Sequence, residues 1–231
     1  MNSGGISFQL SSHYGFIAAD EEFIYAVDSV DDAVIRYTHE GIVSSKVRFG
    51  DKRIGNLVPA PGGLLFCNLF DDDDTSKDEI AILKADMLPS PRFGLGLLDT
   101  AGQMTVVGEE LFVCDTGNDR LQVFSLTGEH RRSIEGKWRS PRYLCFAKDR
   151  LYLVEAVYPG VIDGRRILVL SLQGDILQVI TPPGEPTAVF DTLGQPICCF
   201  DRKLLASYYT TRGTGTGRSE SGNRMLALQG L

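Results

Sequence analysis

The chain has 231 residues, 43% of them hydrophobic, and a formal net charge of −7. These values suit one globular domain spanning residues 1–231 and argue mildly against a general binder of phosphate backbones. No stretch approaches the ~20 consecutive apolar residues of a membrane span. The first residues have neither the basic region nor the apolar run of a signal peptide. The five cysteines, an odd number without CxxC spacing, favour reduced thiols, so we expect a cytoplasmic protein with no membrane partner.

Short strand patterns separated by turn residues follow one another along the chain. An isolated strand is expected at 5–10, followed by groups of strands over 16–49, 55–93, 104–134 and 142–180. The last strand of the second group is weak, because MLPSPRF holds two prolines, which suit only sheet edges. No long segment shows the 3.6-residue period of a helix. We therefore predict an all-β fold.

The C-terminal region allows two strand registers. In the first, PICCF, LLASYY and RMLALQ form three neighbouring strands, and GISFQL at 5–10 supplies the fourth. In the second, TAVFDTLGQPICCFD forms a hairpin and the C-terminus supplies the remaining two strands. We favour the first register, because it uses the otherwise unpaired N-terminal strand and removes an open sheet edge.

One strand–turn–strand unit recurs along the chain. Its clearest copy is LFVCDTGNDRLQVFSLTG at 111–128, and weaker copies cover 23–41, 64–86, 151–174 and 204–230. The residues that close the first strand of each copy are Asp28, Asn68, Asp115, Glu155 and Ser207. Their spacings of 40, 47, 40 and 52 residues are typical of propeller blades, which are small twisted sheets packed radially about an axis.

The stretch LFVCDTGNDRLQVFSLTG resembles an NHL repeat, whose motif runs apolar-Val-x-Asp-x-x-Asn-x-Arg-apolar-x-Val-Phe-x-x-x-Gly. The other four units match this motif in pattern more than in identity. The resemblance implies a β-propeller. We expect five blades of four antiparallel strands, with the ring closed by the N-terminal strand; a six-bladed or incomplete ring is the alternative. The resemblance implies little about activity, because the family and its relatives include scaffolds, nucleic-acid binders and enzymes.

Four polar residues occupy one position in successive units: Asp28, Asn68, Asp115 and Glu155. In a propeller such positions form a ring about the axis, where their oxygens could hold a hard cation such as Ca²⁺. Lactonase-type propellers similar to this fold bind a divalent metal in this way, so a metal-dependent lactonase- or lyase-like enzyme is the alternative function. Against it, each acidic side chain can cap its own turn, and Ser207 interrupts the ring. We expect turn capping, with no bound metal or other cofactor.

A basic stretch, HRRSIEGKWRSPRY, covers 130–143. It places the single tryptophan among five cations; the residues are Arg131, Arg132, Lys137, Trp138, Arg139 and Arg142. Single-stranded nucleic acid binds to cationic side chains interleaved with aromatic rings, and some NHL domains bind RNA through a basic face. The simpler interpretation is an edge strand protected by charges, with Trp138 packed between blades. We favour the simpler interpretation and place RNA binding third among the functions.

Three connections between second and third strands are longer than the scaffold needs: 70–79, 156–165 and 210–223. In a propeller they emerge on one side of the disc, and loops of surplus length are where binding usually takes place. The first is acidic, the second apolar and the third basic. The residues expected on this face are Asp71, Asp72, Asp73, Asp74, Tyr158, Arg212 and Arg218. We therefore predict a binding or scaffold protein that presents these loops to a protein or small ligand.

Overall fold

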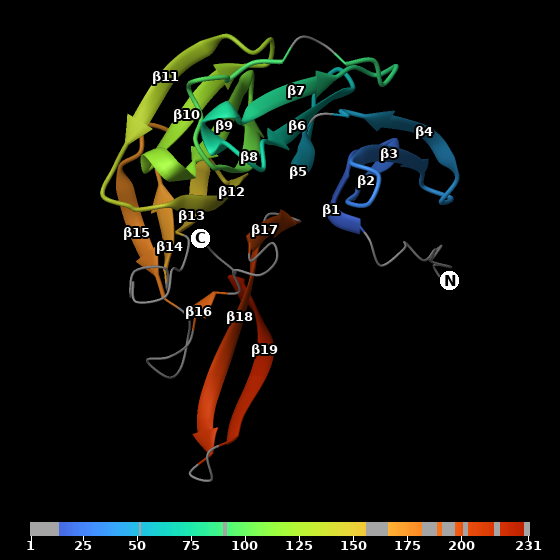
Figure 1. The fold of residues 1–231 in the computed structure, drawn as a ribbon. Coiled ribbons are helices and arrows are strands. Elements are labelled where there is room, and N and C mark those ends of the chain that lie inside the picture. The colour runs from blue at the N-terminus through green and yellow to red at the C-terminus, as the bar shows by residue number, and fades with distance from the viewer. Residues whose placement is uncertain are drawn as a thin grey trace. The chain divides into compact units, whose positions relative to one another are not determined.

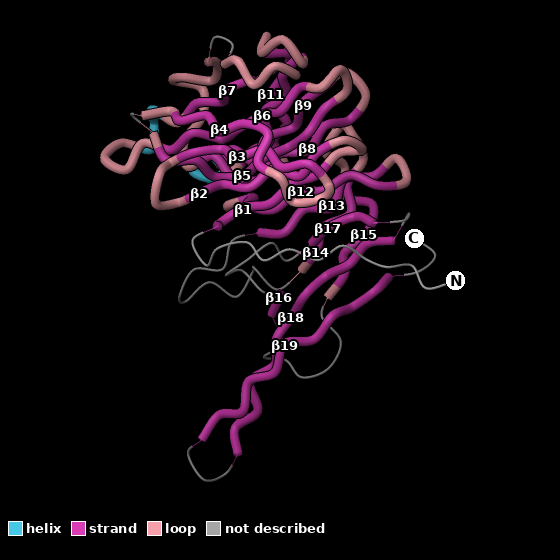
Figure 2. The backbone as a smooth tube through the Cα atoms, turned by 90° about the vertical axis from the view of Figure 1, so that its right-hand side faces the viewer, coloured by secondary structure: helices cyan, strands magenta, loops and turns pink. Residues whose placement is uncertain are grey.

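The computed structural model describes residues 14–50, 52–89, 92–155, 166–181, 189–190, 197–200, 203–214 and 218–228. The chain forms two compact units, one made of Met1–Ala101 with Thr127–Glu129 and the other of Gly102–Leu126 with His130–Leu231. In the described residues, helical geometry is confined to two 3₁₀ turns, Thr75–Lys77 and Thr116–Asn118, while the strands pair antiparallel (Figure 2). The prediction of an all-β fold is confirmed.

The first unit holds two sheets, with strand orders β1-β2-β3-β4 and β5-β6-β7 (Figure 1). The strand bounds are Tyr14–Ala19 (β1), Phe23–Asp28 (β2), Ala33–Thr38 (β3), Val43–Arg48 (β4), Arg53–Ala60 (β5), Leu64–Phe70 (β6) and Glu79–Leu83 (β7). Beyond β7, single bridges join Ile80 to Phe93 and Leu83 to Pro89 in place of a fourth strand. The expectation of a weak, proline-limited last strand in this group is confirmed.

The second unit contains two complete four-stranded sheets, β8 to β11 and β12 to β15, and a third sheet near the C-terminus. The strand bounds are Ala101–Val107 (β8, which begins at the last residue of the first unit), Glu110–Asp115 (β9), Arg120–Ser125 (β10), His130–Glu135 (β11), Pro141–Ala147 (β12), Arg150–Glu155 (β13), Ile167–Leu170 (β14) and Ile176–Ile180 (β15). The third sheet comprises Val189–Phe190 (β16), Ile197–Phe200 (β17), Lys203–Thr214 (β18) and Arg218–Leu228 (β19).

In the third sheet, β18 pairs with β17 on one side and with β19 on the other. This is the first of the two registers considered for the C-terminal region. The strand expected at 5–10, which would close the ring, lies outside the described residues. Both views show β18 and β19 running together as one long hairpin (Figures 1 and 2).

Alternating side chains build a core between neighbouring sheets, because successive residues of a strand point to opposite faces. In β9, Phe112 and Cys114 join one buried cluster that also receives Leu151 and Leu153 from β13. In the first unit, a second cluster joins Tyr25 and the rest of its sheet to residues of β5, β6 and β7. Burial of this apolar area is the main force that holds each pair of sheets together.

Three cysteines, Cys67, Cys114 and Cys145, lie within β6, β9 and β12, as the strand pattern predicted. All three are buried and are not joined in disulfides. Burial raises the pKa of the Cys67 thiol well above its usual range, so this thiol stays protonated. Among the described residues, no helix has the length and apolar character needed to cross a membrane.

Candidate functional site

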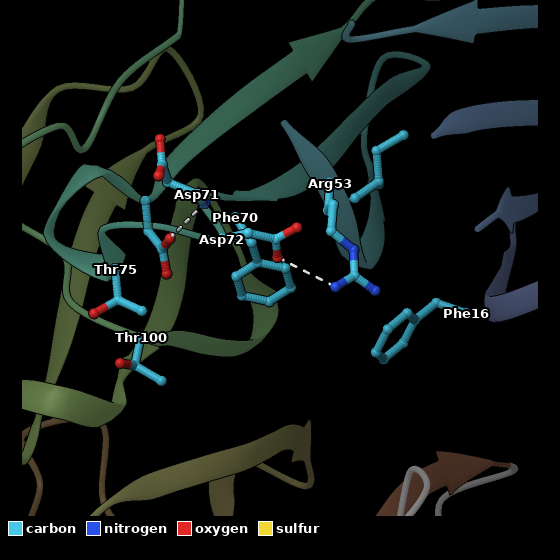
Figure 3. A pocket seen from close by; sticks show the side chains of 9 residues that line it. Phe16, Arg53, Phe70, Asp71, Asp72, Thr75 and Thr100 are labelled. Atoms are coloured by element: carbon cyan, nitrogen blue, oxygen red, sulfur yellow. Dashed lines mark hydrogen bonds and ion pairs between the residues drawn. The ribbon is translucent and has the colours of Figure 1, made fainter. Parts of the chain in front are cut away.

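The connection between β6 and β7, residues 71–78, forms one wall of a pocket inside the first unit, with a volume of ≈ 350 Å³ (Figure 3). The pocket is lined by Phe16, Arg53, Ile54, Phe70, Asp71, Asp72, Thr75, Asp78 and Thr100. Carboxylates and aromatic rings therefore meet in one cavity. We call residues 71–78 the acidic loop.

Some carboxylates of the acidic loop hold its own backbone. Asp71 accepts hydrogen bonds from the backbone N–H of Asp73 (3.1 Å) and of Asp74 (3.0 Å), which is the arrangement of an Asx turn. Asp74 accepts from the N–H of Ser76 (3.2 Å) and caps the 3₁₀ turn Thr75–Lys77. These contacts give the loop a defined shape, which a flexible surplus segment would lack.

Lys52 anchors the acidic loop to the strand before it. Its side chain is only 8% exposed, and its ammonium donates to Asp71 Oδ2 (2.8 Å) and to the carbonyl of Lys77 (2.9 Å). The hydrogen bond from Lys52 holds the pKa of Asp71 below its ordinary value. Asp71 is therefore a carboxylate at neutral pH whose charge is largely matched by Lys52.

Asp78 is the buried member of the loop, with no exposed surface. Its Oδ1 accepts from the N–H of Asp71 (3.2 Å) and its Oδ2 from the N–H of Ala101 (2.8 Å). Burial raises the pKa of Asp78, in the opposite direction to that of Asp71. Because both oxygens accept backbone N–H groups, Asp78 joins the loop to the start of β8 and is a structural residue.

Asp72 and Asp73 differ from these loop carboxylates, because both side chains face solvent. Asp72 lies 3.2 Å from the guanidinium of Arg53. Both side chains of this ion pair are exposed, Asp72 at 63% and Arg53 at 60%. Such an exposed ion pair contributes little to stability and exchanges partners readily. These two aspartates are therefore the members of the loop that are open to a ligand.

Two phenylalanines give the pocket an apolar side. Figure 3 shows Arg53 between Phe70, from the end of β6, and Phe16, from β1. The Phe70 ring lies so close to Gly55 that a Cβ at this position would stand 2.2 Å from the ring. Phe16 remains 36% exposed. Gly55, at the irregular part of β5, thus makes room for the ring that lines the pocket.

The residues of the predicted ring form hydrogen bonds within the scaffold, and one of them, Asn68, reaches the strand that follows its sheet. Asp28 accepts from the N–H of Val30 (3.1 Å) and of Asp31 (3.3 Å), as turn capping requires, and also pairs with Lys46 (3.3 Å). Asn68 donates from its Nδ2 to the carbonyl of Ala101 (2.7 Å). In the first unit, then, Asp28 holds its own turn and Asn68 holds the start of the following strand.

Asp115 and Glu155 form matching pairs with arginine in the second unit. Asp115 is buried and its Oδ2 accepts from Arg120 Nε (2.8 Å), the residue directly opposite it on β10. Glu155, also buried, accepts from Arg166 Nε (2.8 Å) just before β14. Each carboxylate therefore closes the second and third strands of its own sheet. Among the described residues, His, Cys, Asp and Glu side chains do not gather in threes as a metal site would require.

The basic stretch at 130–143 contains β11 and the start of β12. Trp138 is 3% exposed and belongs to the buried cluster shared by the two sheets on either side of it, so its ring is not open to stack on a base. Arg132 of β11 reaches across β10 and forms a two-point ion pair with Glu110 of β9. Of the two interpretations of this stretch, these positions fit the charged edge strand with a packed tryptophan.

The third predicted binding loop differs from the expectation. The connection 210–223 is not a loop, because β18 continues to Thr214 and β19 starts at Arg218, and Arg212 lies opposite Glu220 on paired strands. The β-branched threonines of this stretch favour extended structure and let the ladder begun by Leu204 and Leu228 continue. Tyr158 and the rest of 156–165 lie outside the described residues.

Sequence reasoning found the acidic loop but missed its surroundings. Phe16 of β1 and Arg53 of β5 line the pocket, and Lys52, just before β5, holds Asp71. None of them carries a recognisable motif, and their approach depends on how the first two sheets of the unit pack. The two prolines after β7 gave no hint of the pocket either. Gly55 before the strand irregularity is the one local signal that points to a close approach by a neighbouring side chain.

No family model matches the sequence, and no curated protein matches it. Several solved structures, by contrast, are similar to this chain. Virginiamycin B lyase from Staphylococcus aureus is similar to this chain with a TM-score of 0.64 at 13% identity, covering 91% of this chain and 70% of the lyase. Hydrazine synthase from Kuenenia stuttgartiensis gives a TM-score of 0.68 at 14% identity, with 97% of this chain and 65% of that chain covered.

A third similar structure is a chain of the nidogen/laminin complex, with a TM-score of 0.56 at 17% identity, covering 72% of this chain and 62% of that chain. Together with the antiparallel four-stranded sheets, these similarities show that the protein has a β-propeller fold. At such low identity they establish the fold alone, since one fold hosts many unrelated functions.

Proposed function

We propose that this protein is a binding propeller, and that the acidic loop and its pocket take a basic segment of a partner protein. The observation that carries the proposal is that some carboxylates of the loop hold its backbone while others are exposed. Asp71, Asp74 and Asp78 hold the loop, whereas Asp72, which lines the pocket, and Asp73 are exposed to solvent. A preformed loop with outward carboxylates binds without paying the entropy of ordering itself.

The charge of the site selects the partner. Residues 70–79 contain six acidic residues and one basic residue. A complementary partner segment is therefore rich in lysine or arginine, and this complementarity raises the association rate and sets the orientation. The exposed Phe16 ring and the Phe70 ring add faces on which an arginine or lysine side chain can lie.

The fold comparison agrees with a binding role. The similar chain from the nidogen/laminin complex belongs to a complex between proteins. The predicted enzyme alternative relied on Asp28, Asn68, Asp115 and Glu155, and these side chains already serve as hydrogen-bond partners within the scaffold. The acidic loop, by contrast, carries Asp72 and Asp73, which are exposed, and the contact of Asp72 with the scaffold is an exposed ion pair with Arg53.

The test is a titration of a fluorescently labelled peptide of alternating lysine, arginine and glycine, followed by anisotropy at two salt concentrations. The variant Asp72→Asn/Asp73→Asn removes two exposed charges while leaving Asp71, Asp74 and Asp78 in place. We expect about a tenfold loss of affinity, because each exposed charge contact is worth roughly 0.5–1 kcal/mol.

The matched control is Glu21→Gln/Glu22→Gln, which makes the same change in net charge on two exposed residues of the same unit. It should bind the peptide as the parent protein does. If both double variants lose affinity equally, the peptide responds to net charge and the acidic loop is not its site.

A further inference from the structure

The last strands of the three complete sheets differ in charge. The strand β4, VSSKVR, carries Lys46 and Arg48, and β11, HRRSIE, carries Arg131 and Arg132. The strand β15 reads ILQVI and has no charged residue. Natural proteins place charges, especially lysine, on edge strands to stop them from pairing with other chains. Of these three strands, β15 alone lacks that protection.

The edge of β15 is accessible as well as uncharged. Among the described strands it pairs with β14 only, and it is the last strand of its sheet. Three of its four apolar side chains are well exposed, at 38% for Ile176, 49% for Leu177 and 46% for Val179, while Ile180 is buried. An edge strand in this state presents a row of backbone N–H and C=O groups next to uncovered apolar surface.

The sequence of β15 is self-complementary. In an antiparallel pair of two copies centred on Gln178, Leu177 of each copy lies opposite Val179 of the other, and Ile176 lies opposite Ile180. Residues directly opposite each other share one face of the sheet. The exposed Leu177 and Val179 side chains of both copies would therefore form one apolar cluster, with the two glutamine amides side by side on the axis.

We propose that two copies of this protein associate through β15, forming a continuous antiparallel sheet about a two-fold axis at Gln178. This proposal is independent of the acidic loop, which lies in the other unit. The occupant is a second copy of the chain because pairing β15 antiparallel with itself brings the exposed Leu177 and Val179 of both copies together and leaves no charged side chain of the strand in the new interface. An interface built on one five-residue strand is small, so the dimer is weak and depends on concentration.

The first test is sedimentation velocity over a wide concentration range, with the parent protein and the variant Leu177→Lys/Val179→Lys. The two lysines copy the protection seen on β4 and β11 and place like charges around the axis. We expect the parent to shift from monomer towards dimer over about a hundredfold rise in concentration and the variant to stay monomeric. The matched control, Val43→Lys, makes an apolar-to-lysine change on β4 and should dimerise as the parent does.

The second test fixes the register. Gln178→Cys places a thiol next to its own copy across the axis, so mild oxidation should yield a covalent dimer. Thr181→Cys lies three residues from the centre, so its two copies would be about 20 Å apart and should not cross-link. The parent protein under the same oxidation corrects for its native cysteines. A parent that stays monomeric throughout, a Leu177→Lys/Val179→Lys variant that still dimerises, or equal cross-linking at 178 and 181 would overturn the proposal.

Discussion

The β9–β10 turn and the β6–β7 connection differ in length, but residues at both form hydrogen bonds with the first residue of the sheet that follows. In the short turn, Thr116 donates to the carbonyl of Pro141 (2.6 Å), the first residue of β12. At the long connection, Asn68 of β6 and Asp78 of the loop hold the carbonyl and the N–H of Ala101, the first residue of β8. Each connection thus holds the first strand of the sheet that follows.

The difference between them follows from the residue that is held. Pro141 has no N–H, so a single hydroxyl satisfies its backbone, and the carboxylate of Asp115 is left to close its own turn. Ala101 has both an N–H and a carbonyl, and the N–H needs an acceptor. Asp78 supplies it, and the longer loop that leads to Asp78 is the segment that also carries the exposed Asp72 and Asp73.

The largest effect is expected for Asp115→Ala, which should lower the free energy of unfolding by about 3 kcal/mol. Asp115 accepts hydrogen bonds from Asn118, Arg120 and Gln122, and Gln122 is buried with it. Its loss leaves these donors without their acceptor. Urea denaturation measures the change, and Glu135→Ala, on an exposed residue of β11, is the control. A loss no larger than that of the control would contradict this reading of the short turn.

Asp78→Ala should cost about 2 kcal/mol, because it leaves the backbone N–H groups of Asp71 and Ala101 without an acceptor in a buried site. Hydrogen exchange adds a local readout, since the amide of Ala101 should exchange faster in the variant. An unchanged exchange rate at Ala101 would show that Asp78 does not hold β8.

The pH dependence of stability sharpens this prediction. Burial raises the folded-state pKa of Asp78 above its ordinary value of 3.8. The folded protein therefore holds this proton more tightly than the unfolded chain does. The resulting stabilisation of the folded state is complete below pH 3.8 and is lost as the pH rises through the folded-state pKa. Relative to Asp78→Asn, the parent should lose stability as the pH rises from 3.8. Urea midpoints of the two proteins that run parallel across this pH range would argue against a buried, proton-binding Asp78.

Thr116→Val should cost about 1 kcal/mol, since it removes one buried hydrogen bond to Pro141 while keeping the shape of the side chain. The effect should be smaller than that of Asp78→Ala, because one backbone group loses its partner in place of two. Thermal or urea denaturation compares the two variants directly, and the reverse order would break the parallel drawn between the two connections.

The smallest effect on stability is expected for Asp72→Asn/Asp73→Asn, within about 0.5 kcal/mol of the parent. These side chains are exposed, and the loop is held by Asp71, Asp74 and Asp78. A large loss of stability in the urea curve would mean that the exposed carboxylates are also structural, and the separation between holding and binding residues would fail.

The sequence predicted the strands and their grouping well because the signal is local. The alternation of Leu111 to Asp115 and the turn residues after it specify a hairpin without help from the rest of the chain. The two prolines in MLPSPRF likewise predicted where the second sheet would lack a strand.

The pocket was not predictable in the same way, because its walls come from separate strands. Nothing in the sequence near Asp78 shows that its partner is Ala101, 23 residues further on. The 210–223 segment misled for the opposite reason: its glycines and polar residues resemble a loop, whereas continued pairing from Leu204 makes it a hairpin. Contacts between residues far apart in the sequence determine both the pocket and the hairpin, and local composition does not predict such contacts.

The most direct measurement is an amide chemical-shift map of the ¹⁵N-labelled protein during titration with the basic peptide. We expect shifts at residues 71–78 and at Arg53, with residues 115–120 of the short turn unchanged. The long connection carries the exposed Asp72 and Asp73, whereas the exposed carboxylate of the short turn, Asp119, accepts a hydrogen bond from the backbone N–H of Ser140. Shifts centred on 115–120, or none at 71–78 at saturating peptide, would contradict the assignment of the binding site to the acidic loop.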